Sequence, residues 1–350
     1  MGEISEDDRR RGGYVPMVEV RRGGIAESLH YGAIAVVDSN DRLLASAGDP
    51  ECVTFIRSAG KPAQILPLLG SGAVERFGFE PGHLAVMMGS HGGEPFHLAA
   101  VGEILSRIGL NESALRCGTH EPLHRATAMA LRAAGRKPTV LHNNCSGKHA
   151  GMLALAVQRG ESIESYLDPS RPLQVDIRRV IERLSGLAQS GVSTALDGCS
   201  APTFAMSLRS AALLYARLIA PHDDARELEP AIRRGLEAMR ARPEMIGGTD
   251  RLESDLMREG RLGLIAKIGA EGLFALGFER EGKGVGIVLK ISDGDMHRAR
   301  DCATLECLRQ LGVLSPETSA ALSTRYSQPI VNHNGRPVGE LAPCFQLSSG

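Results

Sequence analysis

The sequence predicts an α+β fold, in which strands from both chain ends form an antiparallel sheet beside a central helical lobe. β-branched runs bounded by glycine occur near the two ends, whereas helical periodicity dominates the middle of the chain. Strands, then a series of helices, then further strands is the order typical of an α+β domain. We expect residues 1–13 to be a disordered tail and 14–350 to be one catalytic domain of two lobes.

The first strands are expected at 18–22, 32–38 and 43–47, with a polar turn before the third. An apolar run predicts a short strand at 84–88, before a glycine-rich turn. Amphipathic patterns predict helices at 94–108, 123–134, 147–158, 174–187, 203–219 and 224–239. Strands return at 262–267, 273–276 and 285–291, and a last helix is expected at 296–311.

Composition indicates a globular protein that binds neither nucleic acid nor membrane. The 350 residues are 43% hydrophobic and 23% charged, and the formal net charge is -1. No apolar segment approaches the roughly 18 residues of a membrane helix. The N-terminus has no secretory pattern, so we expect a cytoplasmic location. Seven cysteines, an odd number, then favour free thiols over a disulfide framework.

The first candidate motif is the Ser58-x-x-Lys61 pair, preceded by Arg57. Residues three apart on a helical turn share a face, and a lysine at this spacing can activate a serine nucleophile. The lysine must be neutral to accept the proton, which burial and a neighbouring cation such as Arg57 can achieve. The pair also occurs by chance, and the alternative is that Ser58 only caps a helix.

Two further motifs concentrate polar groups at glycine-rich turns. The first holds Gly89 and Ser90, and its alternative is an ordinary glycine-rich connection. The second runs from residue 142 to 152 and includes Asn144, Cys145 and Lys148. So dense a set of amide, thiol and amine groups indicates a site, since it is costly to hold for packing alone.

The last two motifs place single reactive residues in unusual positions. Cys199 follows Asp197 and is expected to lie just before a helix; by spacing alone, it and Cys145 are more simply buried thiols than metal ligands. Lys267 lies in a short apolar strand, where an ammonium group needs a partner or a lowered pKa. The alternative for Lys267 is an edge lysine whose amine reaches solvent.

Taken together, these motifs resemble the asparaginase II family, the class of the Rhizobium-type bacterial asparaginases. The resemblance runs from about residue 18 to 341, and the stretch from 142 to 152 is its most specific part. It implies a fold similar to serine β-lactamases and bacterial glutaminases. Lys267-Ile268-Gly269 resembles the Lys-Thr-Gly strand of β-lactamases but lacks the hydroxyl, so we expect no β-lactam hydrolysis.

The activity that the resemblance implies is hydrolysis of L-asparagine to aspartate and ammonia through an acyl-enzyme. It implies two serine–lysine pairs, and we expect Ser58 to be the nucleophile. The catalytic residues implied are Ser58 with Lys61 and Ser90 with Lys267. Candidates for binding the substrate are Arg57, Gly89, Asn144, His149 and Asp197.

The resemblance also implies a zinc ion held by Cys145, Lys148 and Cys199, and a homodimer; no organic cofactor is expected. Three protein ligands would leave one position open to water or substrate. Two other interpretations remain open. One is a serine hydrolase of the β-lactamase or peptidase type, and the other is a non-catalytic zinc protein.

Overall fold

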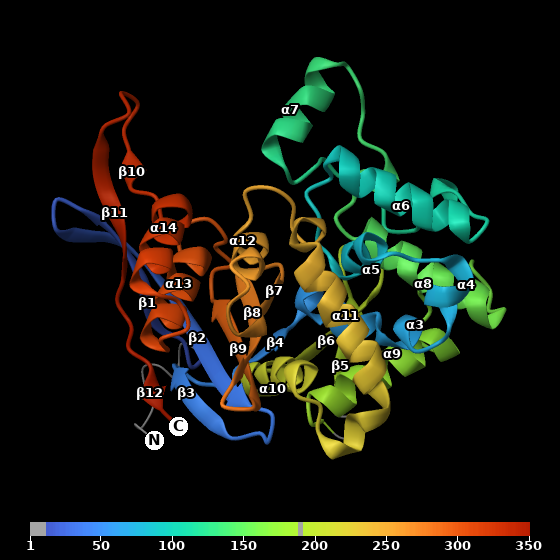
Figure 1. Ribbon diagram of the computed structural model, residues 1–350. Helices are drawn as coiled ribbons and strands as arrows, with labels where there is room; N and C mark the ends of the chain where they lie inside the picture. Colours follow the sequence, from blue (N-terminus) through green and yellow to red (C-terminus); the bar gives the residue numbers. More distant parts are fainter. Residues whose placement is uncertain (1–11, 188–191) are drawn as a thin grey trace. The chain divides into compact units, whose positions relative to one another are not determined.

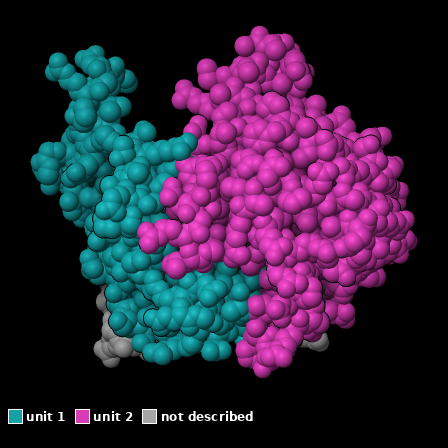
Figure 2. Space-filling view, viewed as in Figure 1, with its two compact units in different colours: residues 1–56, 206–220, 268–350 teal, residues 57–205, 221–267 magenta. Residues whose placement is uncertain are grey.

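The computed structural model describes residues 12–187 and 192–350, so most of the predicted 1–13 tail lies outside the described residues (Figure 1). The chain divides into two compact units, coloured separately in Figure 2. Unit 1 comprises residues 1–56, 206–220 and 268–350, and unit 2 comprises residues 57–205 and 221–267. Among the described helices, none is both long and apolar enough to cross a membrane.

Unit 1 is built on an antiparallel sheet whose strands come from both ends of the chain. Along the sheet the order is β10-β11-β1-β2-β9-β8, and β3 also pairs with β2 and β12 with β3. The strands are β1 (Val15–Arg22), β2 (Ile25–Asp38), β3 (Leu43–Ala47), β8 (Leu273–Arg280), β9 (Lys283–Ile291), β10 (Ile330–Val331), β11 (Pro337–Pro343) and β12 (Ser348–Ser349). This confirms the predicted α+β class with its antiparallel sheet.

Helices cover both faces of this sheet. On one face, α10 (Leu208–Ile219) lies so close that a Cβ at Gly284 or Gly286 would overlap its backbone. Strand residues alternate between faces, so Phe274, opposite Leu289 in the register, points the other way. There the guanidinium of Arg300, in α13 (Arg300–Gln310), lies 5.7 Å from the Phe274 ring. The last helix, α14 (Pro316–Tyr326), packs against α13.

Unit 2 is mainly helical, and α8 (Ser146–Arg159) lies in its interior. Each of its first eleven residues is buried, and both α5 and α6 pack against it. The other helices are α2 (Lys61–Gln64), α3 (Leu66–Leu69), α4 (Ala73–Phe77), α5 (Pro81–Met88), α6 (Pro95–Arg107), α7 (Arg125–Ala133), α9 (Pro172–Leu184), α11 (Glu229–Ala241) and α12 (Leu252–Arg258). An antiparallel hairpin joins β5 (Ser193–Leu196) to β6 (Pro202–Ser207), and β7 (Ile265–Ile268) ends the unit's sequence.

Two predicted elements are wrong in type. The apolar run 84–88 belongs to the helix α5, because Pro81 at its start favours a helical turn and His83 accepts the N–H of Glu80. A short buried apolar run does not distinguish strand from helix by pattern. The predicted helix 203–219 is instead strand β6 followed by α10, which starts where the Ser207 hydroxyl caps the N–H of Ser210.

Three other predicted elements begin too early. The helix expected from 296 begins at Arg300, because the Asp295 carboxylate accepts the preceding N–H groups of residues 297–299. The helix expected from 224 begins at Glu229, next to Pro230, after a 3-10 segment. The strand expected from 262 begins at Ile265, since residues 261–263 form a 3-10 turn with Leu262 at a φ of 54°.

Candidate active site

The hydroxyl of Ser90 lies between two buried lysines of unit 2. Its Oγ is 3.0 Å from Nζ of Lys61 and 2.7 Å from Nζ of Lys267. Ser90 is 1% exposed, and both lysines are 0% exposed. Lys61 begins α2, Ser90 follows the end of α5, and Lys267 lies on β7. The fold therefore brings together three of the predicted catalytic residues from distant parts of the sequence.

Two backbone carbonyls fix the orientation of the Lys61 amine. Nζ donates to the carbonyl oxygens of Gly89, at 2.5 Å, and Asn144, at 3.1 Å. A neutral amine has two N–H groups and one lone pair. When the two N–H groups point at these carbonyls, the lone pair is left for the Ser90 hydroxyl. The arrangement therefore suits a neutral lysine acting as a base.

The surroundings of both lysines favour the neutral form. Burial lowers the pKa of Lys61 below its usual 10.5, and the nearby Lys148 charge lowers it further, against the opposing effect of Cys145. Burial also lowers the pKa of Lys267, to well below that value, with a further contribution from the charge of Lys61 and an opposing one from Glu253. These are the shifts that a lysine base requires at neutral pH.

Ser58 lies one turn before Lys61, in the 3-10 helix Arg57–Gly60 that leads into α2. Pro62 is among the first residues of α2, where its missing N–H costs the helix no hydrogen bond. Within the part of the chain that the structure describes, no hydrogen bond joins Ser58 to Lys61. Ser58 is half-buried, in contrast to the enclosed Ser90.

The three predicted metal ligands lie together beside this group. Nζ of Lys148 is 3.2 Å from Sγ of Cys199, and the Cys199 thiol hydrogen-bonds to Cys145. That hydrogen bond holds the pKa of Cys145 well below its usual value, although burial opposes it, while the same contact and burial raise the pKa of Cys199. Burial alone would lower the pKa of Lys148, but the two sulfurs raise it.

The elements that carry these ligands differ in part from the expectation. Cys145 is the N-cap residue of α8, and Lys148 lies in the first turn of that helix. Cys199 lies in the turn between β5 and β6, and therefore precedes a strand and not a helix. In this turn the N–H of Asp197 donates to the carbonyl of Ala201, and Ser200 has a φ of 66°.

Arg57 and Asp197, both predicted to bind substrate, form an ion pair with each other. Nη2 of Arg57 is 2.7 Å from Oδ1 of Asp197, and Nε of Arg57 is 2.9 Å from the same oxygen. Burial alone would raise the pKa of Asp197, but the hydrogen bond and charge of Arg57 keep it below its usual value. Arg57 was expected to lower the pKa of Lys61; in the structure the nearby cation is Lys148.

His149 lies on α8 behind the thiol group and is fully buried. Its Nδ1 is 2.7 Å from the Tyr166 hydroxyl, which also accepts the backbone N–H of Arg116. Nε2 has no hydrogen-bond partner among the described residues. Burial lowers the pKa of His149 well below its usual value, so the ring is neutral. His149 therefore packs inside unit 2 and has no exposed surface at which to bind substrate.

Comparison with known sequences decides the family. The sequence profile of the L-asparaginase II family matches residues 18–343. The chain belongs to the L-asparaginase II family. It is an amidohydrolase, and its substrate is a small molecule. No curated protein matches the chain.

Some solved structures resemble this chain at low sequence identity. The crystal structure of Mglu in its native form is 18% identical, with a TM-score of 0.43, over 88% of this chain and 70% of that one. A Bacillus glutaminase crystallised in the presence of 4.3 M NaCl is 11% identical, with a TM-score of 0.37, over 81% of this chain and 91% of that one. At these values the likenesses carry no argument about function.

Sequence reasoning missed the segment 246–253, which lies against the backbone of Ser90 in the candidate site. The carbonyl of Ile246 accepts the Ser90 N–H at 2.7 Å, and a Cβ at Gly89 would come within 2.5 Å of the Met245 carbonyl oxygen. Glu253 is 0% exposed and raises the pKa of Lys267. The Gly-Gly-Thr-Asp sequence at 247–250 was the available signal, because paired glycines indicate close backbone approach.

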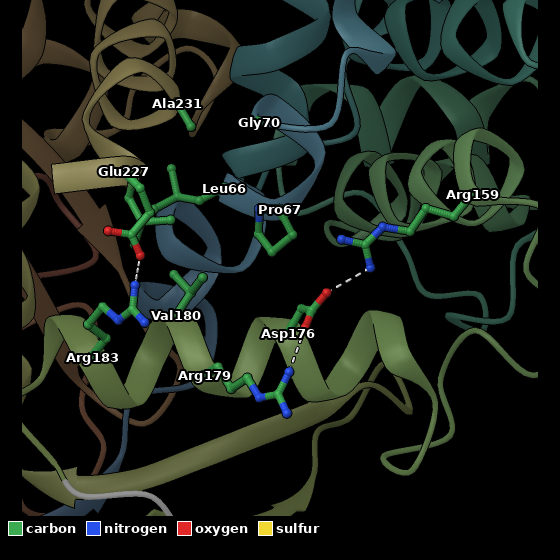
Figure 3. Close-up of a pocket in the computed structure, with 11 residues that line it drawn as sticks. Leu66, Pro67, Gly70, Arg159, Asp176, Arg179, Val180, Arg183, Glu227 and Ala231 are labelled. Carbon is green, nitrogen blue, oxygen red and sulfur yellow. Dashed lines mark hydrogen bonds and ion pairs between the residues drawn. The ribbon is translucent and has the colours of Figure 1, made fainter. Parts of the chain in front are cut away.

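A surface pocket elsewhere in unit 2 is lined by α3, α9 and the start of α11, and Figure 3 shows it. Its arginines already have partners: Asp176 pairs with Arg159 at 2.9 Å and with Arg179 at 3.3 Å, and Arg183 pairs with Glu227. None of the predicted site residues lines it. The candidate active site of this amidohydrolase is therefore the lysine–serine group and not this pocket.

Proposed function

We propose that the protein hydrolyses the side-chain amide of L-asparagine to L-aspartate and ammonia through a serine-linked acyl-enzyme. The observation that carries the proposal is the Lys61–Ser90–Lys267 chain, in which two lysines of lowered pKa share one hydroxyl. Such a chain can take a proton from a nucleophile and return it to a leaving group. Membership of the L-asparaginase II family supports the choice of substrate.

Exposure favours Ser58 as the nucleophile and Ser90 as the proton relay. Ser58 is half-buried, so a substrate carbon can reach its hydroxyl. Ser90 is enclosed, and its Oγ already contacts both lysines. The missing Ser58–Lys61 hydrogen bond does not exclude the role, because catalytic hydrogen bonds often form only when substrate is bound.

The proposed reaction needs no reactant other than asparagine and water. As the Ser58 oxygen attacks the amide carbon of asparagine, the lone pair of Lys61 Nζ turns from the Ser90 hydroxyl and takes the Ser58 proton. The amide nitrogen takes a proton relayed through Ser90 and leaves as ammonia, which forms a β-aspartyl ester on Ser58. Water then attacks the ester and gives its proton to the lysine chain, and Ser58 regains a proton as aspartate is released.

The Arg57–Asp197 pair supplies one charge of each sign for an amino-acid zwitterion. Arg57 binds the α-carboxylate of asparagine and Asp197 binds the α-ammonium group. Both side chains keep some solvent exposure, 26% and 11%, so substrate can reach them. The carbonyls of Gly89 and Asn144 act by orienting Lys61, and His149 stabilises the interior of α8 behind the site.

The donor set of Cys145, Lys148 and Cys199 fits zinc. Two sulfurs and an amine nitrogen are ligands that zinc accepts, and three of them leave one open position. Among the described residues, no group of three His, Cys, Asp or Glu side chains could hold a metal, so Lys148 is needed as the third ligand. Zinc there would polarise or orient the substrate, and the serines and lysines would carry the covalent chemistry.

The test is ammonia release from L-asparagine and, separately, L-glutamine, with and without a chelator. The nucleophile is identified by quenching the reaction with labelled asparagine and digesting the protein with trypsin. Ser58 and Ser90 fall in different tryptic peptides, 58–76 and 77–107, because Lys61 precedes a proline. Label on 58–76 supports the proposal, and label on 77–107 would make Ser90 the nucleophile. Absence of ammonia from asparagine would refute the substrate.

The same proposal includes two further expectations: the protein is cytoplasmic, and it forms a homodimer. They rest on the family resemblance. Light scattering of the purified protein during size-exclusion chromatography would measure the subunit number. Fractionation of the producing cells would locate the activity.

A further inference from the structure

Glu94 is a buried carboxylate that is satisfied without a lysine or arginine. It is 4% exposed, and none of the described lysines or arginines pairs with it. One oxygen accepts the Thr249 hydroxyl at 2.6 Å, and the other accepts the Thr249 N–H at 3.0 Å. A Cβ at Gly248 would overlap the second oxygen, so only glycine allows this approach. The turn at 247–249 is therefore built around this carboxylate.

The Thr249 hydroxyl also determines whether Nε2 of His124 donates or accepts in their hydrogen bond. A hydroxyl has one proton, and here it goes to Glu94, because a carboxylate only accepts. Nε2 of His124, at 3.2 Å from the same hydroxyl, must then be the donor. Nδ1 of His124 lies 2.8 Å from the Thr127 hydroxyl, and the backbone N–H of His124 donates to the Gly92 carbonyl. Thr249 thus joins three separate segments, 92–94, 124–127 and 247–249.

This junction lies directly beside the backbone that holds Ser90. The Ser90 N–H donates to the carbonyl of Ile246, three residues before Thr249. Glu94, the other end of the junction, is four residues after Ser90. The junction is therefore linked to Ser90 in two ways, through the Ile246 carbonyl and along the chain from Glu94. A shift of the turn would move Ser90 relative to Lys61 and Lys267.

We propose that Thr249 is a positioning residue, whose hydroxyl ties the 246–249 turn to Glu94 and so holds Ser90 between the two lysines. The inference rests on the proposed function, in which Ser90 relays protons. Thr249 is exposed, so its replacement does not open a cavity in the core. Small misplacements of a catalytic group can cost about 100-fold in rate.

The experiment compares Thr249→Val, which removes the hydroxyl at constant shape, with Thr249→Ser, which keeps it. Thr324→Val, at an exposed site on α14, is the control. For Thr249→Val we expect kcat to fall about 10- to 100-fold with little change in KM. Thr249→Ser and the control should stay within about threefold of the wild type. Amide hydrogen exchange of the peptide containing Ser90 should accelerate in Thr249→Val alone.

Each other outcome overturns the inference. If Thr249→Val kept wild-type kcat and exchange, the hydroxyl would position nothing. If the serine and valine variants lost activity equally, the hydroxyl would not be the feature that matters. A loss of rate with unchanged exchange would mean that Thr249 acts on the substrate. If the wild type released no ammonia from asparagine, the proposed function would fail, and the exchange comparison alone would decide the role of Thr249.

Discussion

Replacing Lys267 by methionine should abolish most activity and leave the protein folded. The amine of Lys267 is 2.7 Å from Ser90 Oγ, and its side chain is fully buried. Removing a positioned acid–base group costs about 10²- to 10⁴-fold in rate, or about 3 to 5 kcal/mol of transition-state stabilisation. Methionine has a similar length and brings no charge to desolvate.

The stability of Lys267→Met should change little, because two effects oppose each other. The lost hydrogen bond to Ser90 contributes about 1 kcal/mol. Removing an amine whose burial lowers its pKa also removes a desolvation cost. We expect the melting temperature to shift by no more than about 3 °C.

Lys290→Met is the matched control for this experiment. Lys290 is also buried, burial also lowers its pKa, and its amine donates to the carbonyl of Glu271 at 2.6 Å. It lies in unit 1, outside the proposed site. The measurement is steady-state ammonia release beside thermal unfolding for both variants. Lys267→Met with more than a tenth of wild-type kcat would refute the relay, as would an equal loss in Lys290→Met.

Three further predictions follow from the same site. Ser58→Ala should retain the fold and lose ammonia release by at least about 1,000-fold; a substantially active variant would move the nucleophile to Ser90. Activity should rise with pH along a limb whose midpoint lies below the usual lysine pKa of 10.5, because the neutral forms are needed and burial lowers the pKa of Lys61 and Lys267; a kcat/KM profile flat from mildly acidic to alkaline pH would contradict a lysine base. Wild-type protein should bind zinc, and Cys199→Ser should lose it, with KM rising more than kcat falls. Zinc content is measured by elemental analysis. If zinc-supplied wild type contains no zinc, or the variant retains all of it, the thiols are buried core residues and not metal ligands.

The fold class was accessible from the sequence because its signals are long and periodic. The predicted strands near both ends and most predicted central helices overlap observed elements, whereas α14, β10, β11 and β12 were not predicted. The run at 84–88 failed because five buried apolar residues fit a strand as well as a helix. The segment 203–219 failed because Ser207, which ends a strand and caps a helix, lies inside one continuous apolar pattern.

The sequence pointed to residues that lie together in the structure, but not to the contacts between them. Local spacing placed Cys145 and Lys148 together on one turn of α8. It also suggested that Lys61 pairs with Ser58, whereas in the structure Lys61 contacts Ser90 from a different segment. That contact depends on how α5 ends and on the Ile246 carbonyl that holds the Ser90 N–H. Neither feature leaves a pattern in the local sequence.

The charges of the site explain how two lysines can be neutral beside a third. Lys148 has two sulfurs as neighbours, which raise its pKa, so the positive charge of the cluster is most stable there. Its charge then lowers the pKa of Lys61, whose amine lies against the carbonyls of Gly89 and Asn144 and the Ser90 hydroxyl. The Cys145 thiol, whose pKa is held low, balances the charge on Lys148 and limits its effect on Lys61. The thiols and Lys148 therefore tune the base, and a variant at either cysteine should shift the pH–rate limb.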